Sequence, residues 1–277
     1  MTETGIFKSY YDKKHRKIKE EYFQINKIKN GIYKSYHRNG NLWININYIN
    51  NKANGIYNMF WENGKLWKEV YCLNGQMNGI YKSYYDNGKL YCEVNYIDGK
   101  ENGIYKSYHN NGQLWTEINY IDGKKNGIYI EYYENGQLNE EINYIDSKRN
   151  GIYKSYYWNG QLWTEINYIE DKKNGIYKKY YENEQLKEEG IYIDDKLNGI
   201  YKKYYKNGRL QREVNYVDDK KNSIYKEYYE NGQLKEEINY INGIRHGIYR
   251  KYHITGQLEQ EINYNENIET KIYKSVK

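Results

Sequence analysis

A fixed period of 24 residues runs through the chain and constrains its fold more than any other feature. The tripeptide Gly-Ile-Tyr, or a close variant, begins each copy. Such self-similarity is typical of repeat proteins, in which each copy packs against its neighbours. The copies start at Gly31, Gly55, Gly79, Gly103, Gly127, Gly151, Gly175, Gly199, Ser223 and Gly247.

The repeats fill the chain and leave no linker or second domain. An earlier copy starts at Gly5, 26 residues before Gly31, and its extra residues lie in the turn at 12–16. We therefore divide the chain into a degenerate N-terminal capping repeat (1–30), ten tandem 24-residue repeats (31–270) and a terminal capping strand (271–277).

Each repeat predicts a β-hairpin, for which the copy from Gly103 to Asn126, GIYKSYHNNGQLWTEINYIDGKKN, is representative. Two β-rich stretches, 104–109 and 114–121, flank Asn111-Gly112, a dipeptide that favours a two-residue type I′ turn. A longer polar turn is expected at 122–126. Because apolar residues alternate and proline is absent, we expect an all-β fold. The predicted architecture is an elongated, twisted, single-layer antiparallel meander of repeated hairpins.

A two-residue turn at Asn111-Gly112 predicts how the two strands pair. Lys106 then lies opposite Glu117, Gly103 opposite Tyr120 and Tyr108 opposite Trp115. A three-residue loop with a bulge would shift this pairing by one residue. The recurring Lys and Glu positions favour the first register, because paired opposite charges stabilise neighbouring strands.

The two faces of such a sheet are expected to differ. Equivalent positions of successive repeats form columns, which we name by their residue in the representative repeat. The predicted larger apolar face carries the columns of Tyr105, His109, Leu114, Ile118 and Tyr120. The predicted more polar face carries the columns of Ile104, Lys106, Tyr108, Trp115, Glu117 and Asn119.

Two aromatic columns on the more polar face form a predicted stripe confined to the first two thirds of the chain. Lys187, Gln211, Lys235 and Glu259 replace the rings further along. Exposed aromatic residues are typical anchors of protein interfaces, although rings can also serve only to cover a sheet. The candidate partner-binding residues are Trp43, Trp67, Tyr91, Trp115, Trp163, Tyr36, Phe60, Tyr84, Tyr108 and Tyr156.

Composition narrows the class of protein. Tyr supplies 40 residues while hydrophobic residues make up only 38%, which suits a thin structure whose rings bury one end and keep a hydroxyl in water. The 43 basic and 37 acidic residues are interspersed, a pattern that favours solubility over nucleic-acid binding. With no apolar run long enough to span a bilayer and no signal peptide, we expect an intracellular, cytoplasmic protein that is not secreted.

The repeat pattern Gly-x-Tyr-x-x-Tyr-Tyr-x-Asn-Gly-x-Leu-x-x-Glu-x-x-Tyr, as in Gly127 to Tyr144, resembles the variant MORN repeat of bacterial antitoxin-like and large-virus proteins. It departs from the standard MORN unit, because Ser107 or Lys179 stands where that unit has a second Gly. The resemblance implies an elongated single-layer β-sheet. It also implies roles in protein contacts, dimerisation and phospholipid binding.

No constellation of residues predicts an enzyme. No nucleotide-binding or hydrolase motif interrupts the repeats, and we expect no catalytic residues, no cofactor and no metal. His37, His109 and His253 share a column otherwise held by Tyr, so their rings are expected to replace tyrosines rather than to bind a metal. Cys72 and Cys92 are expected to be free thiols, since a strand separates them.

The sequence thus favours a non-enzymatic scaffold that binds an unknown protein partner or its own copy through the aromatic stripe. A second hypothesis is a peripheral membrane module that binds anionic lipid through basic loops such as Lys124-Lys125 and Lys172-Lys173, although nearby acidic residues oppose it. Glycan binding on stacked rings is a third. No nucleic-acid partner is expected.

Overall fold

The computed structural model describes residues 3–274, with side chains described for residues 3–270. Within this range the regular structure consists of thirty β-strands and contains no helix, which confirms the all-β prediction. The chain divides into two compact units. The N-terminal unit comprises Met1–Gln137 and Tyr144–Ser147, and the C-terminal unit comprises Leu138–Asn143 and Lys148–Lys277.

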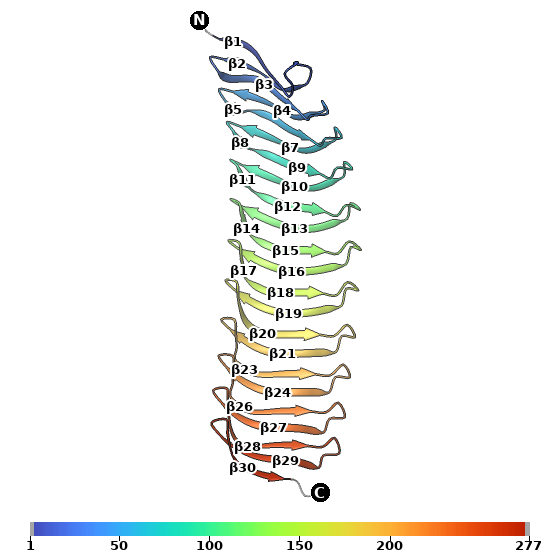
Figure 1. Cartoon of the computed structure of the whole chain (residues 1–277), viewed down its shortest axis with the longest axis vertical. Helices are drawn as coiled ribbons and strands as arrows, with labels where there is room; N and C mark the ends of the chain where they lie inside the picture. The colour runs from blue at the N-terminus through green and yellow to red at the C-terminus, as the bar shows by residue number, and fades with distance from the viewer. Residues whose placement is uncertain (1–2, 275–277) are drawn as a thin grey trace. The chain divides into compact units, whose positions relative to one another are not determined.

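Antiparallel hairpins follow one another in chain order within the N-terminal unit (Figure 1). Long strands alternate with two-residue strands that extend the sheet beside the turns. The strands are β1 (Thr4–Tyr10), β2 (Ile18–Ile25), β3 (Ile28–Tyr36), β4 (Leu42–Ile49), β5 (Lys52–Ala53), β6 (Gly55–Phe60), β7 (Leu66–Leu73), β8 (Gln76–Met77), β9 (Gly79–Tyr84), β10 (Leu90–Ile97), β11 (Lys100–Glu101), β12 (Gly103–Tyr108), β13 (Leu114–Ile121), β14 (Lys124–Lys125) and β15 (Gly127–Tyr132).

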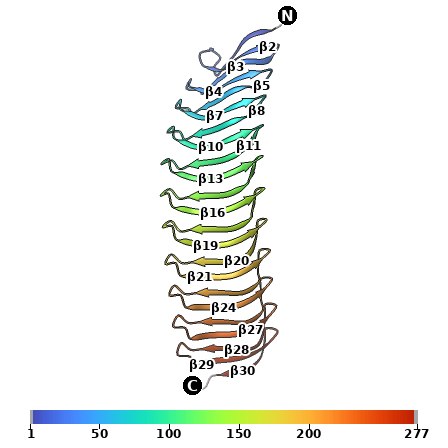
Figure 2. The same ribbon diagram turned by 180° about the vertical axis from the view of Figure 1, so that it is seen from behind.

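The C-terminal unit repeats the same arrangement, as the view from behind also shows (Figure 2). Its final strand contains part of the predicted terminal strand, while residues 275–277 lie outside the described residues. The strands are β16 (Leu138–Ile145, of which 138–143 belong to this unit), β17 (Lys148–Arg149), β18 (Gly151–Tyr156), β19 (Leu162–Ile169), β20 (Lys172–Tyr180), β21 (Leu186–Ile193), β22 (Lys196–Leu197), β23 (Gly199–Tyr204), β24 (Leu210–Val217), β25 (Lys220–Lys221), β26 (Ser223–Tyr228), β27 (Leu234–Ile241), β28 (Ile244–Tyr252), β29 (Leu258–Asn265) and β30 (Ile268–Lys274).

The predicted strand register holds except beside the Asn-Gly turn. Lys106 pairs with Glu117 and Gly103 with Tyr120, as expected. Tyr108, however, pairs with Leu114 rather than Trp115, because a β-bulge interrupts the ladder between Ser107 and Tyr108. Trp115 is therefore an extra residue in its strand, and the same shift recurs in the hairpins β6–β7, β18–β19 and β23–β24.

The Asn-Gly turn causes this bulge, and its predicted type I′ geometry is wrong. Gly112 N–H donates to the carbonyl of His109, and His109 N–H donates to the carbonyl of Gln113, both at 2.8 Å. Only Gly112, at φ 93°, adopts a positive φ. The loop is thus a tight turn followed by a left-handed Gly, the three-residue hairpin with a bulge, which offsets the pairing by one residue.

The type I′ turn lies instead at the opposite edge of each unit, where a longer polar turn was expected. Asp122 and Gly123 both have positive φ, 50° and 78°, and the flanking Ile121 and Lys124 pair directly. Asn, Asp and Gly tolerate this conformation best. Glu170-Asp171 adopts the same pair of positive φ angles without a glycine. The turn therefore requires positive φ at both positions but does not require glycine at either.

Backbone conformation, as well as the tyrosine ring on the opposite strand, explains why a Gly starts most repeats. Gly103 has φ 100°, where the chain leaves the two-residue strand and enters the long strand. L-residues rarely adopt this φ. Ser223 nevertheless occupies the equivalent place in β26 at φ 96°.

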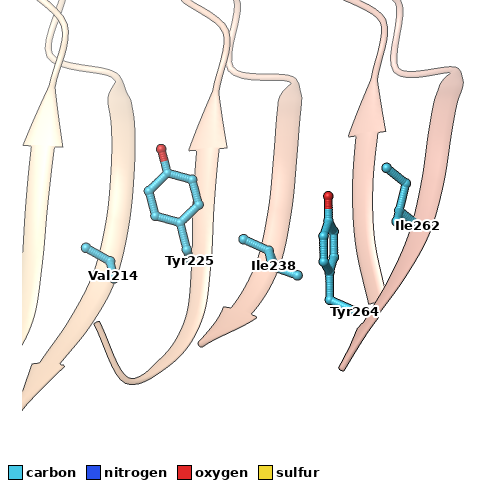
Figure 3. Packing of buried hydrophobic residues seen from close by; sticks show 5 residues of the cluster. All are labelled: Val214, Tyr225, Ile238, Ile262 and Tyr264. Atoms are coloured by element: carbon cyan, nitrogen blue, oxygen red, sulfur yellow. The ribbon is translucent and has the colours of Figure 1, made fainter. Parts of the chain in front are cut away.

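The core of each unit lies on one face of its sheet. In the C-terminal unit, Val214, Tyr225, Ile238, Ile262 and Tyr264 are buried together (Figure 3). Tyr201, Tyr216, Tyr240 and Tyr249 pack around this cluster. Within one repeat two such rings meet edge to face, for example Tyr201 and Tyr216 with centroids 6.0 Å apart. Tyrosine rings therefore cover the aliphatic side chains that a second layer would cover in a sandwich.

Candidate interaction surfaces

Each sheet has two chemically distinct faces, because side chains alternate along a strand. The tyrosine face holds the core and carries the columns of Tyr105, Ser107, Thr116, Ile118 and Tyr120. The isoleucine face carries the columns of Ile104, Lys106, Tyr108, Glu117, Asn119 and Ile121. Cross-strand pairs such as Lys106 with Glu117 and Tyr105 with Ile118 define this division.

The predicted single aromatic stripe is wrong, because its two columns lie on opposite faces. Trp115 Nε1 lies 3.4 Å from a carboxylate oxygen of Glu131, which belongs to the Ser107 column of the tyrosine face. Lys179, of the same column, lies over the ring of Trp163 at 5.2 Å. The bulge explains the difference, since the extra residue breaks the strict alternation and places the Trp115 column beside the tyrosines.

Leu114 is displaced in the opposite sense. It pairs directly with Tyr108, and directly paired residues share a face. The predicted place of Leu114 on the tyrosine face is therefore also wrong.

Every candidate ring of the Trp115 column packs against the ring that begins the same turn. Trp67 and Trp61 lie closest, with centroids 4.7 Å apart. Trp43 and Trp163 are 39% and 40% exposed, whereas the other three rings are half-buried. The remaining ring pairs are Trp43 with His37, Tyr91 with Tyr85, Trp115 with His109 and Trp163 with Tyr157, at 5.1–5.9 Å.

Side chains of the His109 column bond to the main chain of the following repeat. Tyr85 hydroxyl donates to the carbonyl of Tyr108 at 2.8 Å. His109 Nε2 lies 2.9 Å from the carbonyl of Tyr132 and therefore carries the proton, because a carbonyl only accepts. Trp61 Nε1 donates to the carbonyl of Tyr84 at 3.2 Å. The column thus accepts His, Trp or Tyr because each carries a donor, which supports the interpretation of His37 and His109 as tyrosine replacements. His253 instead lies 3.2 Å from the hydroxyl of Thr255 in its own turn.

The tyrosines of the Tyr108 column, on the isoleucine face, bond to side chains of the preceding repeat instead of to the main chain of the following one. The hydroxyl of Tyr108 donates to Glu93 of the preceding repeat at 3.0 Å, and Tyr84 donates to Glu69 at 2.7 Å. Burial, followed by this hydrogen bond, raises the pKa of Tyr108 to about 12. The candidate residues Tyr36 and Tyr156 make the same contact with Glu21 and Glu141, while Phe60 is half-buried and has no hydroxyl. These half-buried rings therefore hold neighbouring repeats together.

Charged groups replace the rings of the Trp115 column in the later repeats of the C-terminal unit. Lys235 takes the place of the tryptophan and donates to Glu227 at 2.8 Å, while Arg212 lies 3.6 Å from the same carboxylate. Burial alone would raise the pKa of Glu227, but the hydrogen bonds from Lys235 and Tyr225 lower it overall. The same position of the fold thus accepts either a ring or an ion pair.

One exposed aromatic residue escaped the sequence reasoning. Trp158 lies in the Asn-Gly turn of the β18–β19 hairpin and is 67% exposed. Its equivalents in the other repeats are mostly charged or polar, such as Glu134 and Glu182. The difference between Trp158 and its equivalents could have identified this residue from the sequence. With Trp163, it gives one hairpin two exposed indole rings.

Comparison with known proteins settles the family. The family model described as the MORN repeat variant matches the chain ten times, over most of its length. The matched residues are 29–50, 53–72, 77–98, 101–122, 125–146, 149–170, 173–194, 197–218, 221–242 and 245–266. The chain belongs to the MORN repeat variant family. This assignment agrees with the resemblance drawn from the Gly-x-Tyr pattern.

Solved structures similar to these MORN repeats are long chains of which the repeats span about a sixth. The crystal structure of TcdB2-TccC3-TEV matches at 11% identity over 94% of this chain and 17% of that chain, with a TM-score of 0.20. The structure of the Photorhabdus luminescens Tc holotoxin pore matches at 12% identity over 94% and 15%, with a TM-score of 0.18. No curated protein matches the sequence.

The lysines proposed to bind lipid contact carboxylates or tyrosine rings in the MORN repeats. Lys124 lies 3.5 Å from Asp146, and Lys172 lies 3.7 Å from Asp194, each one repeat further along. Lys125 lies over the ring of Tyr144 at 5.1 Å, and Lys173 over that of Tyr192 at 5.1 Å. The two ion pairs reduce the unbalanced positive charge that an anionic surface would attract.

Other chemistry is sparse in the MORN repeats. Among residues 3–274, no three His, Cys, Asp or Glu side chains form a group that could hold a metal ion. Cys72 and Cys92 are free thiols, as expected, and both are buried. No helix in the described part of the chain has the length and apolarity needed to cross a membrane.

Proposed function

We propose that this MORN repeat protein is a non-enzymatic interaction module. It binds another protein through the aromatic edge of its tyrosine face. We define the aromatic edge as the Trp115 column together with Trp158. Its candidate members are Trp43, Trp67, Tyr91, Trp115 and Trp163.

The observation that carries this proposal is that the indole rings are partly exposed and yet held in place. Trp163 is 40% exposed while its ring packs on Tyr157, and the Tyr157 hydroxyl is itself bonded to the carbonyl of Tyr180 at 2.9 Å. Interface anchors are typically such large rings. A ring that is already ordered loses little conformational entropy when a partner covers it.

The Tyr108 column no longer supports partner binding. Its rings lie on the other face, and their hydroxyls are occupied by glutamates of the preceding repeat. The proposal therefore keeps five of the ten residues predicted from sequence and adds Trp158.

The test is a variant in which Trp43, Trp67, Trp115 and Trp163 are all replaced by Lys. The fold accepts Lys in this column at 187 and 235, so the β-sheet circular dichroism should persist. Affinity capture followed by mass spectrometry should then lose the partners that the wild-type chain retains. The matched control is Gln211→Lys, which adds a charge in the same column and should keep them. Unfolding of the quadruple variant, or capture of the same partners by all three proteins, would overturn the proposal.

A further inference from the structure

The aromatic edge runs without interruption through four consecutive repeats of the N-terminal unit. One long strand separates each ring from the next, as β6 separates β4 from β7. Neighbouring strands lie about 4.8 Å apart, so the rings recur at intervals of about 9.6 Å. Lys19 and Asn139 hold the position in the repeats before and after the run. The members of the run, on β4, β7, β10 and β13, are Trp43, Trp67, Tyr91 and Trp115.

Each ring of the run forms a separate platform with the ring that begins its own turn. The two centroids of a pair lie 4.7–5.7 Å apart. In the part of the chain that the structure describes, no ring contact joins one of these pairs to the next. A ligand that covers the run must therefore present one apolar group to each pair, at intervals of about 9.6 Å.

The polyproline II helix is the regular backbone conformation that repeats at this interval. It has three residues per turn and rises about 3.1 Å per residue, so one face recurs every ~9.3 Å. Over the three intervals of the run it departs from the rings by only about 1 Å. An α-helix returns to the same face after seven residues, or about 10.5 Å, and departs by roughly 3 Å over the same distance. An extended strand repeats at about 6.8 Å and fits less well still.

Hydrogen-bond donors on the rings suit the same ligand. The indole N–H groups of Trp43 and Trp67 and the hydroxyl of Tyr91 donate to no group among residues 3–270. Trp43 is 39% exposed, and the polar atoms of Trp67 and Tyr91 reach the surface. A polyproline II segment exposes carbonyl groups that have no internal hydrogen bonds, and its prolines have no N–H. The run therefore offers donors to a main chain that is rich in acceptors.

Charge on the run is complementary to an acidic ligand. Lys68 Nζ lies over the ring of Trp67, 4.5 Å from its centroid. Across the sheet Lys68 pairs with Met59 and Ser83, which carry no charge. No carboxylate of residues 3–270 lies within 4.0 Å of its ammonium group. An acidic side chain of the ligand beside Trp67 would complete this ion pair.

We propose that this run of four rings binds a proline-rich segment of the partner in the polyproline II conformation. The inference rests on the proposed function, because it names the class of partner for the same edge. The run spans about 29 Å, the length of about ten residues of polyproline II. The segment has proline at every third position, one on each ring pair, and an acidic residue beside Lys68. Because this conformation is already ordered in the free segment, binding costs little conformational entropy.

The test titrates the full-length chain against fluorescein-labelled peptides of this length and follows fluorescence polarisation. The first peptide has Pro at every third position with Glu and Ala between. The second has the same composition with Pro at every second position, and the third has Lys in place of Glu. The protein variants are Lys68→Glu and a triple variant with Trp43→Lys, Trp67→Lys and Trp115→Lys. The fold accepts Lys at 187 and 235 and Glu at 140 in these columns, and circular dichroism checks folding.

Wild type should bind the first peptide at least tenfold more tightly than the second, because only the first repeats at the interval of the rings. The triple variant should lose this preference, whereas Trp163→Lys, which lies outside the run, should keep it. Lys68→Glu should bind the Glu peptide at least threefold more weakly and the Lys peptide at least threefold more tightly than wild type does. Misfolding cannot mimic such a reversal.

Equal binding of the first two peptides, no binding of either, or a preference that survives in the triple variant would overturn the inference. Unchanged affinities in Lys68→Glu would overturn the acidic residue assigned to the ligand. The proposed function is judged separately, by the partners that the quadruple tryptophan variant fails to capture. Loss of those partners together with equal binding of the peptides would keep the proposed function and reject the proline-rich segment.

Discussion

The hydroxyl of Tyr85 donates a hydrogen bond of 2.8 Å to the main-chain carbonyl of Tyr108, the last strand residue before the next Asn-Gly turn. That carbonyl lies where the bulge interrupts the ladder, so the ring supplies a donor at an irregular point of the sheet. Tyr157, Tyr181, Tyr205 and Tyr229 repeat the contact in the C-terminal unit.

Removing this donor should cost stability in proportion to one hydrogen bond. Tyr85→Phe should lower the free energy of unfolding by about 1 kcal/mol, because a part-buried carbonyl loses its partner. Tyr85→His should cost less, since His37 and His109 make the same contact. Urea denaturation of the two variants would measure the difference. Equal losses would indicate that ring packing alone accounts for the column.

A substitution at Ser223 should stabilise the protein. Ser223→Gly should raise the free energy of unfolding by about 1 kcal/mol, because Ser223 adopts a φ of 96° that side chains disfavour. The reverse change at Gly199, with φ 101°, is the matched control and should destabilise. Thermal denaturation of both variants would test the pair, and a less stable Ser223→Gly chain would contradict it.

The Lys106–Glu117 pair should contribute little. Its atoms lie 3.4 Å apart and the side chains are 38% and 34% exposed. Glu117→Lys should therefore lower the free energy of unfolding by no more than about 1 kcal/mol, measured by urea denaturation at concentrations where the chain is monomeric. A loss of several kcal/mol would show that this part of the isoleucine face is covered within a single copy.

Alkaline pH should destabilise the fold, because tyrosines of the unfolded chain lose their protons at a lower pH than the same tyrosines in the folded chain. Burial and then the hydrogen bond to Glu21 raise the pKa of Tyr36 to about 12, and Tyr84 and Tyr156 are raised to about 12 in the same way. An unfolded tyrosine titrates near 10. Between these values the folded state binds more protons, so the free energy of unfolding must fall as pH rises from about 10 to 12.

Denaturation at stepped pH, with tyrosinate absorbance as a second signal, would check this expectation. Replacing Tyr36, Tyr84 and Tyr156 by Phe should make the decline shallower. A free energy of unfolding that stays constant up to pH 12 would contradict the assignment.

Periodicity and alternation were sufficient to predict the hairpins. The Lys106–Glu117 register was predicted from a two-residue turn and holds because the bulge at Trp115 compensates for the extra residue of the loop. The turn types were not predictable from the dipeptides, since Asn-Gly fits a type I′ turn and also a turn closed by a left-handed Gly. The wrong choice of turn type led to the wrong predicted face for Trp115. A bulge adds one residue to the strand, so the alternation of side chains shifts at that point. The exposure of Trp158 could have been predicted by comparing the equivalent turn positions of the repeats.

The hydrogen bond from a ring to the following repeat, as from Tyr85 to Tyr108, and the pairing of strands with their immediate neighbours have a consequence at the genetic level. A deletion or duplication of 24 codons would rejoin surfaces of the same kind, so unequal recombination between repeats should shorten or lengthen the protein without removing the contacts between the joined repeats. A deletion of 23 codons would instead reverse the faces of every strand beyond the junction on one side.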